Sequence, residues 1–474
     1  MIKNKVLEVG ILVFIAAAVL TIFSIFPFEY QANKFTIKPI NLFSDITLKG
    51  QLAKAPTTPT ILTDSIIKKF KHVLKERDEN PCTIIEFTTD SISSLSYFFT
   101  ALNEIKTKKK KARIGYFGDS MIEGDLITQD LRKLLQDKFG GDGIGFVPIT
   151  SIVAGFRQTV IHTFSENWRT YNLLDAPNKA KLGISGYGFE PLANPVTADS
   201  IRSYNWGSWV KYTAVKQPHL NNFKSIKMYY GVGGDKNYMF FNDTPIKLSG
   251  TNTVNEAIIN TNSGLTSVKA SFNCSKAIPI YGFSMESDSG IFVDNFSFRG
   301  NSGMPLTKIS PDVFSGMNNY LNYDLIVLQY GINVVNKNVT DYSWYEKGMI
   351  EVINHIKKAM PNTSILLIST SDRAIRQNGV YTTDPAIPIL VESQKRIAQK
   401  TNCAFWNLYQ SMGGANSMVK WAQADTALAN KDYTHFNFRG AKKVAELLYT
   451  YLMEKYDSNE KKNVETSLTT KASL

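Results

Sequence analysis

Apolar residues recur with two different periods along the carboxyl-terminal part of this chain of 474 residues. Continuous apolar runs at 323–333 and 364–370 predict buried strands. Segments 345–360, 388–401 and 438–456 carry apolar residues at helical spacing and predict amphipathic helices. Strands that are buried on both faces and alternate with helices predict an α/β domain with a parallel sheet covered on both sides.

The same domain begins before residue 150. Amphipathic helices are expected at 64–77 and 91–106, around a strand in "CTIIEF". The apolar stretch around Ile114 and Tyr116 predicts another strand, and the leucines of "LITQDLRKLL" predict a helix after it. We therefore assign residues 61–149 and 298–456 to the α/β domain.

The intervening residues 150–297 have a different pattern. Short alternating runs such as "WVKYTAV", "SIKMYYGV" and "SVKASF" are separated by Gly, Asn and Asp. This pattern is typical of antiparallel strands and predicts a β-sandwich inserted into the α/β domain.

The amino terminus carries an uncharged segment, from Val9 to Phe28. A helix of about 20 apolar residues spans a hydrocarbon core, so residues 6–28 are predicted to form a transmembrane anchor. Lys3 and Lys5 precede it, which places the amino terminus in the cytoplasm and the rest of the chain across the membrane. A cleaved signal peptide is the alternative. Residues 29–60 are interpreted as a linker and residues 457–474 as a polar, disordered tail.

Composition is that of a folded globular protein, with 43% hydrophobic and 20% charged residues. The formal net charge of +12 suits an anionic partner, and "KTKKKKAR" at 106–113 is its densest cluster. Export across a membrane argues against nucleic acid as that partner, so the cluster at 106–113 is expected to be a solvated loop. The three cysteines lie far apart without a C-x-x-C pair, so no zinc site is indicated.

Candidate chemistry begins at Ser120, in "IGYFGDSMIEGD", where the predicted strand gives way to a helix. A serine in this position is either a nucleophile or an ordinary helix cap. A nucleophile needs a base that is oriented by an acid. His435 and Asp432 lie three residues apart in the polar loop "NKDYTHFNF" and can supply both, although a capping loop is the alternative for them too.

Donors for an oxyanion are expected from two further motifs. "QYGIN" places Asn333 at the carboxyl end of a buried strand, where open α/β sheets bind ligands, and its side-chain amide can donate. "SFRGNSG" supplies glycines on a turn, where a glycine presents its backbone N–H without obstruction by a side chain, and Gly300 is preferred to Gly303. Each motif alone is also compatible with a plain turn.

Taken in order, the motifs around Ser120, Gly300, Asn333 and His435 resemble those of the SGNH (GDSL-like) hydrolase family. The resemblance implies a flavodoxin-like three-layer fold and a Ser120–His435–Asp432 triad that hydrolyses esters. It also implies an oxyanion hole made by the backbone N–H groups of Ser120 and Gly300 and the side chain of Asn333. Val334 departs from the family pattern, which has an aspartate at that position.

The segments around the serine and before Gly300 are also similar to the peptidoglycan O-acetylesterase branch, which carries a carbohydrate-binding-module-like sandwich. We therefore expect a serine esterase that removes O-acetyl groups from an envelope glycan, anchored in the inner membrane with its catalytic domain outside the cytoplasm. No cofactor, metal or nucleic-acid partner is expected. Three aromatic residues of the insert are candidates for stacking on sugar rings: Trp206, Trp209 and Tyr230. Core packing is the expected role for most of the insert's aromatic residues.

Three alternatives remain open. The same triad could serve an O-acyltransferase, since both reactions share the acyl-enzyme. The ester could carry a different acyl group, as in a lipase. The chain could also be a glycan-binding envelope protein without catalysis.

Overall fold

The computed structural model divides into two units, Met1–Asp78 and Glu79–Leu474. It describes the following residues: 30–32, 35–37, 82–88, 92–175, 181–192, 207–241 and 244–472. The predicted membrane segment 6–28 and the predicted helix 64–77 lie outside these residues. None of the helices in the described ranges is both long and apolar enough to cross a membrane.

The first unit contains one described feature, inside the segment interpreted as a linker. Strand β1 (Tyr30–Ala32) pairs antiparallel with β2 (Phe35–Ile37).

The second unit is built on a six-stranded sheet in the order β16-β4-β17-β18-β21-β3. Its strands are β3 (Ile85–Glu86), β4 (Lys111–Gly118), β16 (Gly290–Ser297), β17 (Leu325–Gln329), β18 (Ser364–Ile368) and β21 (Ala404–Trp406). Five of them are parallel, and their chain order across the sheet is 2-1-3-4-5, the flavodoxin-like arrangement. The edge strand β3 departs from the predicted parallel sheet, because it pairs antiparallel with β21.

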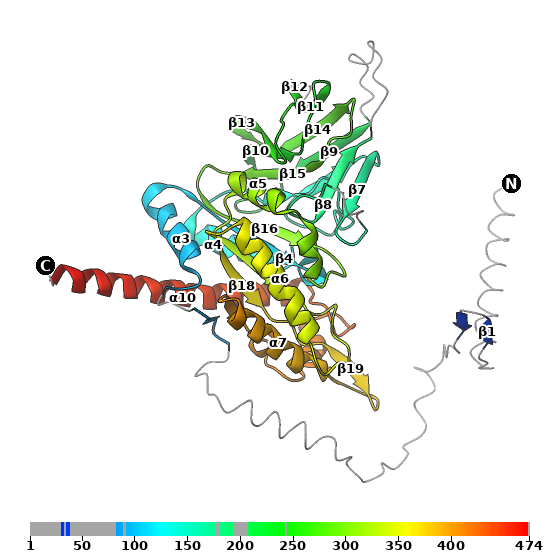
Figure 1. The fold of residues 1–474 in the computed structure, drawn as a ribbon, viewed down its shortest axis with the longest axis vertical. Helices are drawn as coiled ribbons and strands as arrows, with labels where there is room; N and C mark the ends of the chain where they lie inside the picture. The colour runs from blue at the N-terminus through cyan, green and yellow to red at the C-terminus, as the bar shows by residue number, and fades with distance from the viewer. Residues whose placement is uncertain are drawn as a thin grey trace, which may run out of the picture. The chain divides into compact units, whose positions relative to one another are not determined.

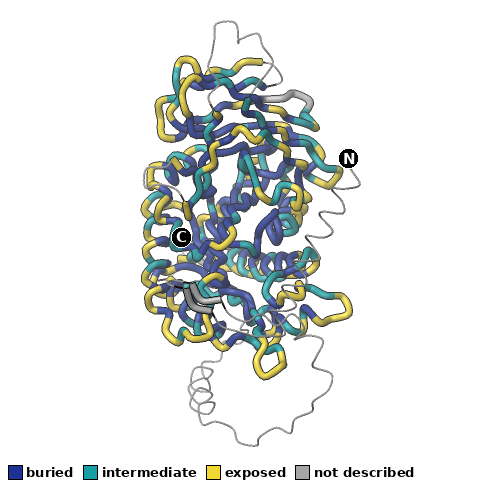
Figure 2. Tube along the Cα trace, turned by 90° about the vertical axis from the view of Figure 1, so that its right-hand side faces the viewer, coloured by how far each residue is buried: buried dark blue, intermediate teal, exposed yellow. Residues whose placement is uncertain are grey.

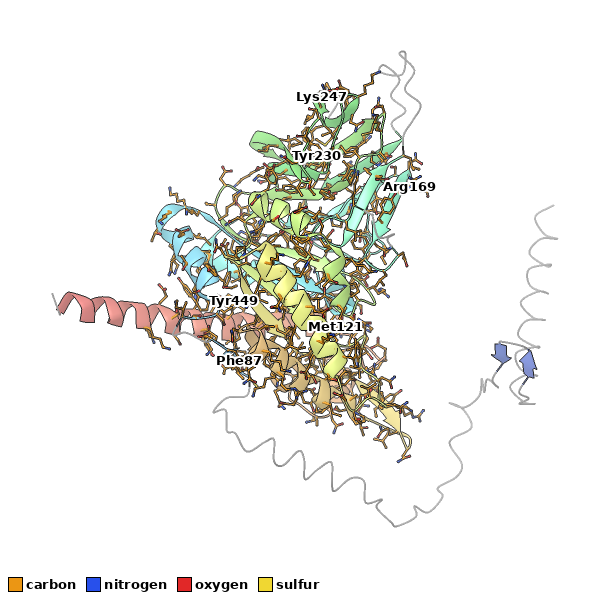
Figure 3. All side chains as sticks on the ribbon, viewed as in Figure 1. Phe87, Met121, Arg169, Tyr230, Lys247 and Tyr449 are labelled. Atoms are coloured by element: carbon orange, nitrogen blue, oxygen red, sulfur yellow. The ribbon has the colours of Figure 1, made fainter. Side chains whose placement is uncertain are left out.

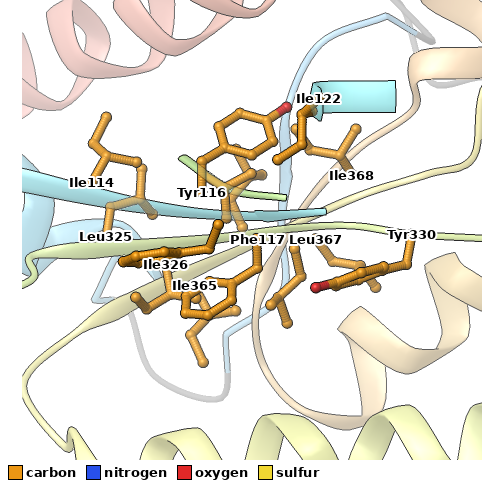
Figure 4. Close-up of a cluster of buried hydrophobic side chains, with 14 of the residues drawn as sticks. Ile114, Tyr116, Phe117, Ile122, Leu325, Ile326, Tyr330, Ile365, Leu367 and Ile368 are labelled. Atoms are coloured by element: carbon orange, nitrogen blue, oxygen red, sulfur yellow. The ribbon is translucent and has the colours of Figure 1, made fainter. Parts of the chain in front are cut away.

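Helices cover both faces of this sheet (Figure 1). One face carries α3 (Ser96–Lys108), α4 (Thr128–Phe139) and α10 (Phe438–Ala472), which pack together. The other carries α5 (Pro311–Leu321), α6 (Ser343–Ala359) and α7 (Ala386–Lys400). Figure 4 shows why both layers are needed, since Tyr116 points to one side of β4 and Phe117 to the other, and both are at most 1% exposed. The predicted three-layer α/β architecture is thus present.

Short elements lie between these helices and strands. The 3₁₀ helix η2 (Ser120–Asp125) follows β4, and η4 (Met304–Lys308) precedes α5. The sequence pattern missed α5, the hairpin of β19 (Ala374–Gln377) with β20 (Val380–Thr383), and the short helices α8 (Leu408–Ser411) and α9 (Ser417–Gln423).

The inserted segment forms two antiparallel sheets around a second hydrophobic core, seen above the α/β domain in Figure 1. One sheet contains β5 (Gly145–Val147), β7 (Trp168–Asn172), β8 (Tyr187–Pro191), β10 (Phe223–Tyr230), β13 (Asn255–Leu265) and β15 (Ile280–Glu286). The other contains β6 (Ile161–Phe164), β9 (Ser208–Thr213), β11 (Asn237–Phe241), β12 (Thr244–Lys247) and β14 (Ser267–Cys274). In Figure 2, buried chain runs through both the sandwich and the α/β domain.

Both predicted borders of the insert, 150 and 297, are wrong. Strand β5 (Gly145–Val147), expected in the α/β domain, pairs with β15 in the sandwich. Strand β16 (Gly290–Ser297), expected in the sandwich, pairs in parallel with β4 along its whole length. Its Asp294 is fully buried and accepts two hydrogen bonds from Arg113 of β4, so the charge of this strand is paired inside the α/β domain.

Two further expectations need correction. The segment 457–474 was predicted to be a disordered tail, but α10 continues through it as far as Ala472. It contains neither Gly nor Pro to stop the helix. The basic cluster 106–113 is not a solvated loop: it spans the end of α3 and the start of β4, and Arg113 is buried with Glu286 and Asp294.

Candidate active site

Ser120 follows strand β4, which lies between β16 and β17, at the carboxyl edge of the sheet. Gly118 ends this strand, and a Cβ there would lie 2.9 Å from the side chain of Ile122 and 3.1 Å from the carbonyl oxygen of Gln329. The side chain of Asp119 caps η2 by accepting a hydrogen bond from the N–H of Met121 at 3.0 Å. Asp119 is therefore the helix cap, and the hydroxyl of Ser120 is left available for other contacts.

That hydroxyl lies against the imidazole of His435. Ser120 Oγ is 2.9 Å from His435 Nε2, although 315 residues separate the two in sequence. On the other side of the ring, His435 Nδ1 lies 2.8 Å from Oδ2 of Asp432. The three predicted residues thus form one continuous chain of hydrogen bonds.

Asp432 is held by its own loop. Its Oδ1 accepts hydrogen bonds from the backbone N–H groups of Thr434 and His435, each at 3.0 Å. Partial burial raises the pKa of Asp432, but the backbone and ring N–H groups of His435 and the N–H of Thr434 outweigh it and hold this pKa below its usual value. The group is therefore a carboxylate at neutral pH, which favours the tautomer of His435 with its proton on Nδ1.

The loop that carries His435 is fixed from outside. Tyr433 adopts a φ of 55°, a left-handed conformation that costs a non-glycine residue energy. Its ring stacks on Tyr381 of the β19–β20 hairpin, with centroids 3.9 Å apart, and its carbonyl accepts a hydrogen bond from Ala374 at 3.0 Å. Sequence reasoning missed this support, because the hairpin has no recognisable motif.

Asn333 lies beside the serine turn. Its side-chain amide donates to Oδ2 of Asp119 at 3.1 Å and to the carbonyl oxygen of Asn301 at 3.0 Å. Burial raises the pKa of Asp119 to about 7, against the lowering effects of the Met121 N–H, the charge of His435 and the Asn333 amide. The sequence pointed to Asn333 but not to its contact with Asp119.

The two candidate glycines have different environments. Gly303 is buried, and its N–H already donates to the side chain of Asn301 at 2.9 Å. Gly300 is exposed, with a φ of 75° and open space where a Cβ would lie. Within the described ranges, the backbone N–H groups of Ser120 and Gly300 donate to no protein acceptor. Gly300 is thus the glycine of this turn that remains able to donate.

A pocket of about 340 Å³ opens onto Ser120 and His435. Apolar side chains form much of its wall: Met121, Leu126, Val153, Phe156 and Phe436. Figure 3 labels Met121, which marks this region of the α/β domain. Arg299 also lines the pocket and forms an ion pair with Glu123. We call this cavity the serine pocket.

The turn after the serine is anchored by a buried charge. Asp125 is fully buried and accepts hydrogen bonds from Thr128, Arg132 and Thr159 at 2.6 to 2.8 Å. Although burial opposes ionisation, the nearby arginines Arg132 and Arg157 hold the pKa of Asp125 well below its usual range. This cluster fastens η2 to α4 and to the first loop of the insert.

Within the described part of the chain, no group of three or more His, Cys, Asp or Glu side chains is placed to hold a metal ion.

Comparison with solved structures places this geometry in a known fold. A peptidoglycan O-acetylesterase structure matches 79% of this chain and 99% of its own chain, with 21% sequence identity and a TM-score of 0.64. This chain has the fold of the SGNH hydrolases. The resemblance drawn from its motifs is therefore confirmed at the level of fold.

Two other structures also match. An acetyl xylan esterase matches 34% of this chain and 79% of its own, with 21% identity and a TM-score of 0.26. A family two carbohydrate esterase from Clostridium thermocellum, in complex with cellohexaose, matches 62% and 98%, with 8% identity and a TM-score of 0.26. No protein-family model matches the chain, and no curated protein matches it in sequence.

Proposed function

We propose that this chain is a serine esterase that removes O-acetyl groups from a cell-envelope glycan, with peptidoglycan as its substrate. The observation that carries the proposal is the continuous contact from Ser120 Oγ through His435 to Asp432, at 2.9 and 2.8 Å. These distances lie within the reach that proton transfer from a serine nucleophile requires.

The proposed first half-reaction forms an acetyl-enzyme. His435 Nε2 takes the proton from Ser120 Oγ, which attacks the carbonyl carbon of the ester. When the tetrahedral intermediate collapses, the bond to the sugar oxygen breaks and His435 returns the proton to that oxygen. Asp432 keeps the imidazole oriented and stabilises its positive charge while it carries the proton.

The second half-reaction repeats these roles with water. His435 removes a proton from the water molecule, the hydroxide attacks the acetyl carbon, and acetate leaves as Ser120 recovers its proton. The proposed oxyanion donors in both halves are the N–H groups of Ser120 and Gly300 and the side-chain amide of Asn333. Because both amide protons of Asn333 are engaged by Asp119 and Asn301, this amide must share or exchange one of those bonds during the reaction.

Support for an acetylated glycan comes from the fold comparison. The structure that shares this fold over 99% of its own length is named a peptidoglycan O-acetylesterase. This chain also has the two-sheet insert beside the α/β domain, so the overall arrangement suits a polymeric substrate.

We also propose that the catalytic unit lies outside the cytoplasm, on an anchor formed by residues 6–28. The uncharged segment 9–28 and the preceding Lys3 and Lys5 support this orientation. A reporter that is active only in the periplasm should be active when fused after Leu474. Activity of a cytoplasm-only reporter at that position would contradict the proposed topology.

The function is tested by measuring acetate release from purified O-acetylated peptidoglycan, beside O-acetylated xylan and a long-chain aryl ester. We expect peptidoglycan to be the best substrate and Ser120→Ala to reduce kcat by about 10⁴-fold or more. A circular dichroism spectrum equal to that of the wild type provides the folding control. Near-normal release by Ser120→Ala would refute the assignment of the nucleophile. Transfer of acetyl groups to an added sugar in place of water would identify a transferase.

A further inference from the structure

A second pocket of about 200 Å³ lies next to the serine pocket, where the insert meets the α/β domain. Glu123 and Val153 line both cavities, so the two are neighbours with a shared wall. The insert supplies Pro148, Thr150, Thr170, Ser185 and Tyr187 to the new cavity, and the α/β domain supplies Ser297 among others. We call it the seam pocket.

Neutral hydroxyl groups form part of the lining of the seam pocket. Thr170 is exposed on β7 and Thr150 is half-buried opposite it, with their hydroxyl oxygens 3.4 Å apart. Ser151 and Ser185 add two more hydroxyl groups to the lining. Because a hydroxyl can both donate and accept, such a group of side chains suits a ligand that is itself rich in hydroxyl groups.

Tyr187 also lines the seam pocket, and its ring is held in place by a neighbour. The ring of Tyr187 stacks on Phe298, with centroids 4.8 Å apart and planes inclined by 23°. Burial, with a smaller contribution from the charge of Glu123, raises the pKa of Tyr187 to about 12. Its hydroxyl therefore keeps its proton at neutral pH and can donate a hydrogen bond from an already ordered ring.

The charges around the seam pocket are paired with one another. Glu123 forms an ion pair with Arg299, and Arg157 lies 3.2 Å from the buried carboxylate of Asp125. Each of the two acids that line the pocket, Glu123 and Asp125, therefore has a cation beside it. A neutral polar ligand fits this wall better than an anion, because an anion would have to compete for an arginine that is already engaged.

We propose that the seam pocket is a saccharide subsite that binds the sugar next to the acetylated one. The serine pocket then holds the acetylated sugar, and the glycan strand crosses the shared wall at Glu123 and Val153. This inference rests on the proposed function, because it extends the same substrate beyond the reacting ester. Together the two cavities fall within the range of about 300–1,000 Å³ that is usual for ligand sites.

The decisive variant is Thr170→Trp, which places a bulky ring at an exposed position of the subsite. Figure 3 labels its neighbour Arg169 on the same strand. Thr163→Trp is the matched control, because Thr163 is also exposed on a strand of the insert but does not line the pocket. With O-acetylated peptidoglycan fragments, we expect Thr170→Trp to raise KM about tenfold or more, and the control to leave it unchanged.

A small substrate separates binding from chemistry. Neither tryptophan variant should alter the hydrolysis of 4-nitrophenyl acetate, because this ester occupies only the serine pocket. Tyr187→Phe keeps the stacked ring and should raise KM severalfold on the glycan fragments alone. An equal loss on both substrates, or none on the glycan fragments, would overturn the subsite.

Direct binding tests the subsite independently of catalysis. Ser120→Ala should bind unacetylated peptidoglycan fragments in a calorimetric titration, and adding Thr170→Trp should weaken that affinity about tenfold or more. If the wild type fails to hydrolyse any acetyl ester, the proposed function is wrong while this titration still decides the subsite. Absence of binding, or equal affinity with and without Thr170→Trp, would overturn the subsite even if the esterase is active.

Discussion

The side-chain amide of Asn333 donates a hydrogen bond to Asp119, the residue that directly precedes Ser120, over 3.1 Å and across 214 positions of sequence. The other oxygen of the same carboxyl group accepts the N–H of Met121 at 3.0 Å. The buried carboxyl group of Asp119 therefore links two parts of the site. One is the turn that carries Ser120, and the other is the side-chain amide that is proposed to stabilise the oxyanion. The relative position of these two groups is set by Asp119.

Replacing Asn333 with Ala should lower kcat by about 100- to 1,000-fold, the scale for loss of one oxyanion donor. Its KM for an aryl acetate should change little, because the lost hydrogen bond forms mainly in the transition state. Steady-state kinetics on 4-nitrophenyl acetate measure both constants. An unchanged kcat in a variant with a wild-type melting curve would remove Asn333 from the reaction.

Asp119→Asn should change how stability depends on pH. The pKa of Asp119 is raised to about 7 in the folded protein, against about 3.9 in an unfolded chain. Between these values the folded state keeps a proton that the unfolded state has released. The contribution of Asp119 to the free energy of unfolding is therefore full below about pH 4 and falls as the pH rises toward 7. Asparagine does not titrate, so the variant lacks this fall.

Urea denaturation of both proteins at several pH values between about 4 and 7 measures the difference. Asp324, whose pKa burial also raises to about 7, is present in both proteins and cancels in the comparison. The gap between the two curves should change by up to about 1.4 kcal/mol for each pH unit in this window. Parallel curves would show that Asp119 is ionised throughout.

The layers of the fold could be predicted from sequence, but the borders of the insert could not. A continuous apolar run such as 323–333 identifies a buried strand by itself, and β17 lies within it. The run in β16 gives no sign of which sheet it joins, because that depends on its pairing with β4, more than 170 positions away. Strand β5 is three residues long, too short for any periodicity to show.

The site divides in a similar way. Ser120 and the Asp432–His435 pair could be found because short local spacing carries their chemistry. The supports of these residues, such as the contact of Asn333 with Asp119, join segments that are distant in sequence and have no local pattern. The aromatic residues of the insert show that residue type alone does not predict which side chains are exposed. Tyr230 is 5% exposed and belongs to the core, Trp209 is half-buried beneath Lys269, and Trp206 lies outside the described residues.

Asp432→Asn should reduce kcat by about 10⁴-fold while leaving the loop intact. The amide oxygen can still accept the backbone N–H groups of Thr434 and His435, so the turn has its hydrogen bonds. The amide nitrogen then faces His435 Nδ1 as a donor and favours the tautomer with its proton on Nε2, which cannot accept the proton of Ser120. Kinetics across pH, with circular dichroism as the folding control, provide the test. A loss of less than tenfold would show that Asp432 does not determine the tautomer.

Tyr381→Ala should lower kcat without a matching change in KM. Tyr381 is on the β19–β20 hairpin, and its ring stacks on Tyr433, two residues before His435, with centroids 3.9 Å apart. Aromatic pairs of this kind contribute about 0.5–1.5 kcal/mol beyond the area they bury. Without the stack, Tyr433 can leave its strained φ of 55°, and the imidazole spends less time within reach of Ser120 Oγ. We expect a loss in kcat of about two- to tenfold. Tyr381→Phe keeps the ring and should restore most of kcat, so a Phe variant as slow as the Ala variant would mean that the stack does not position His435.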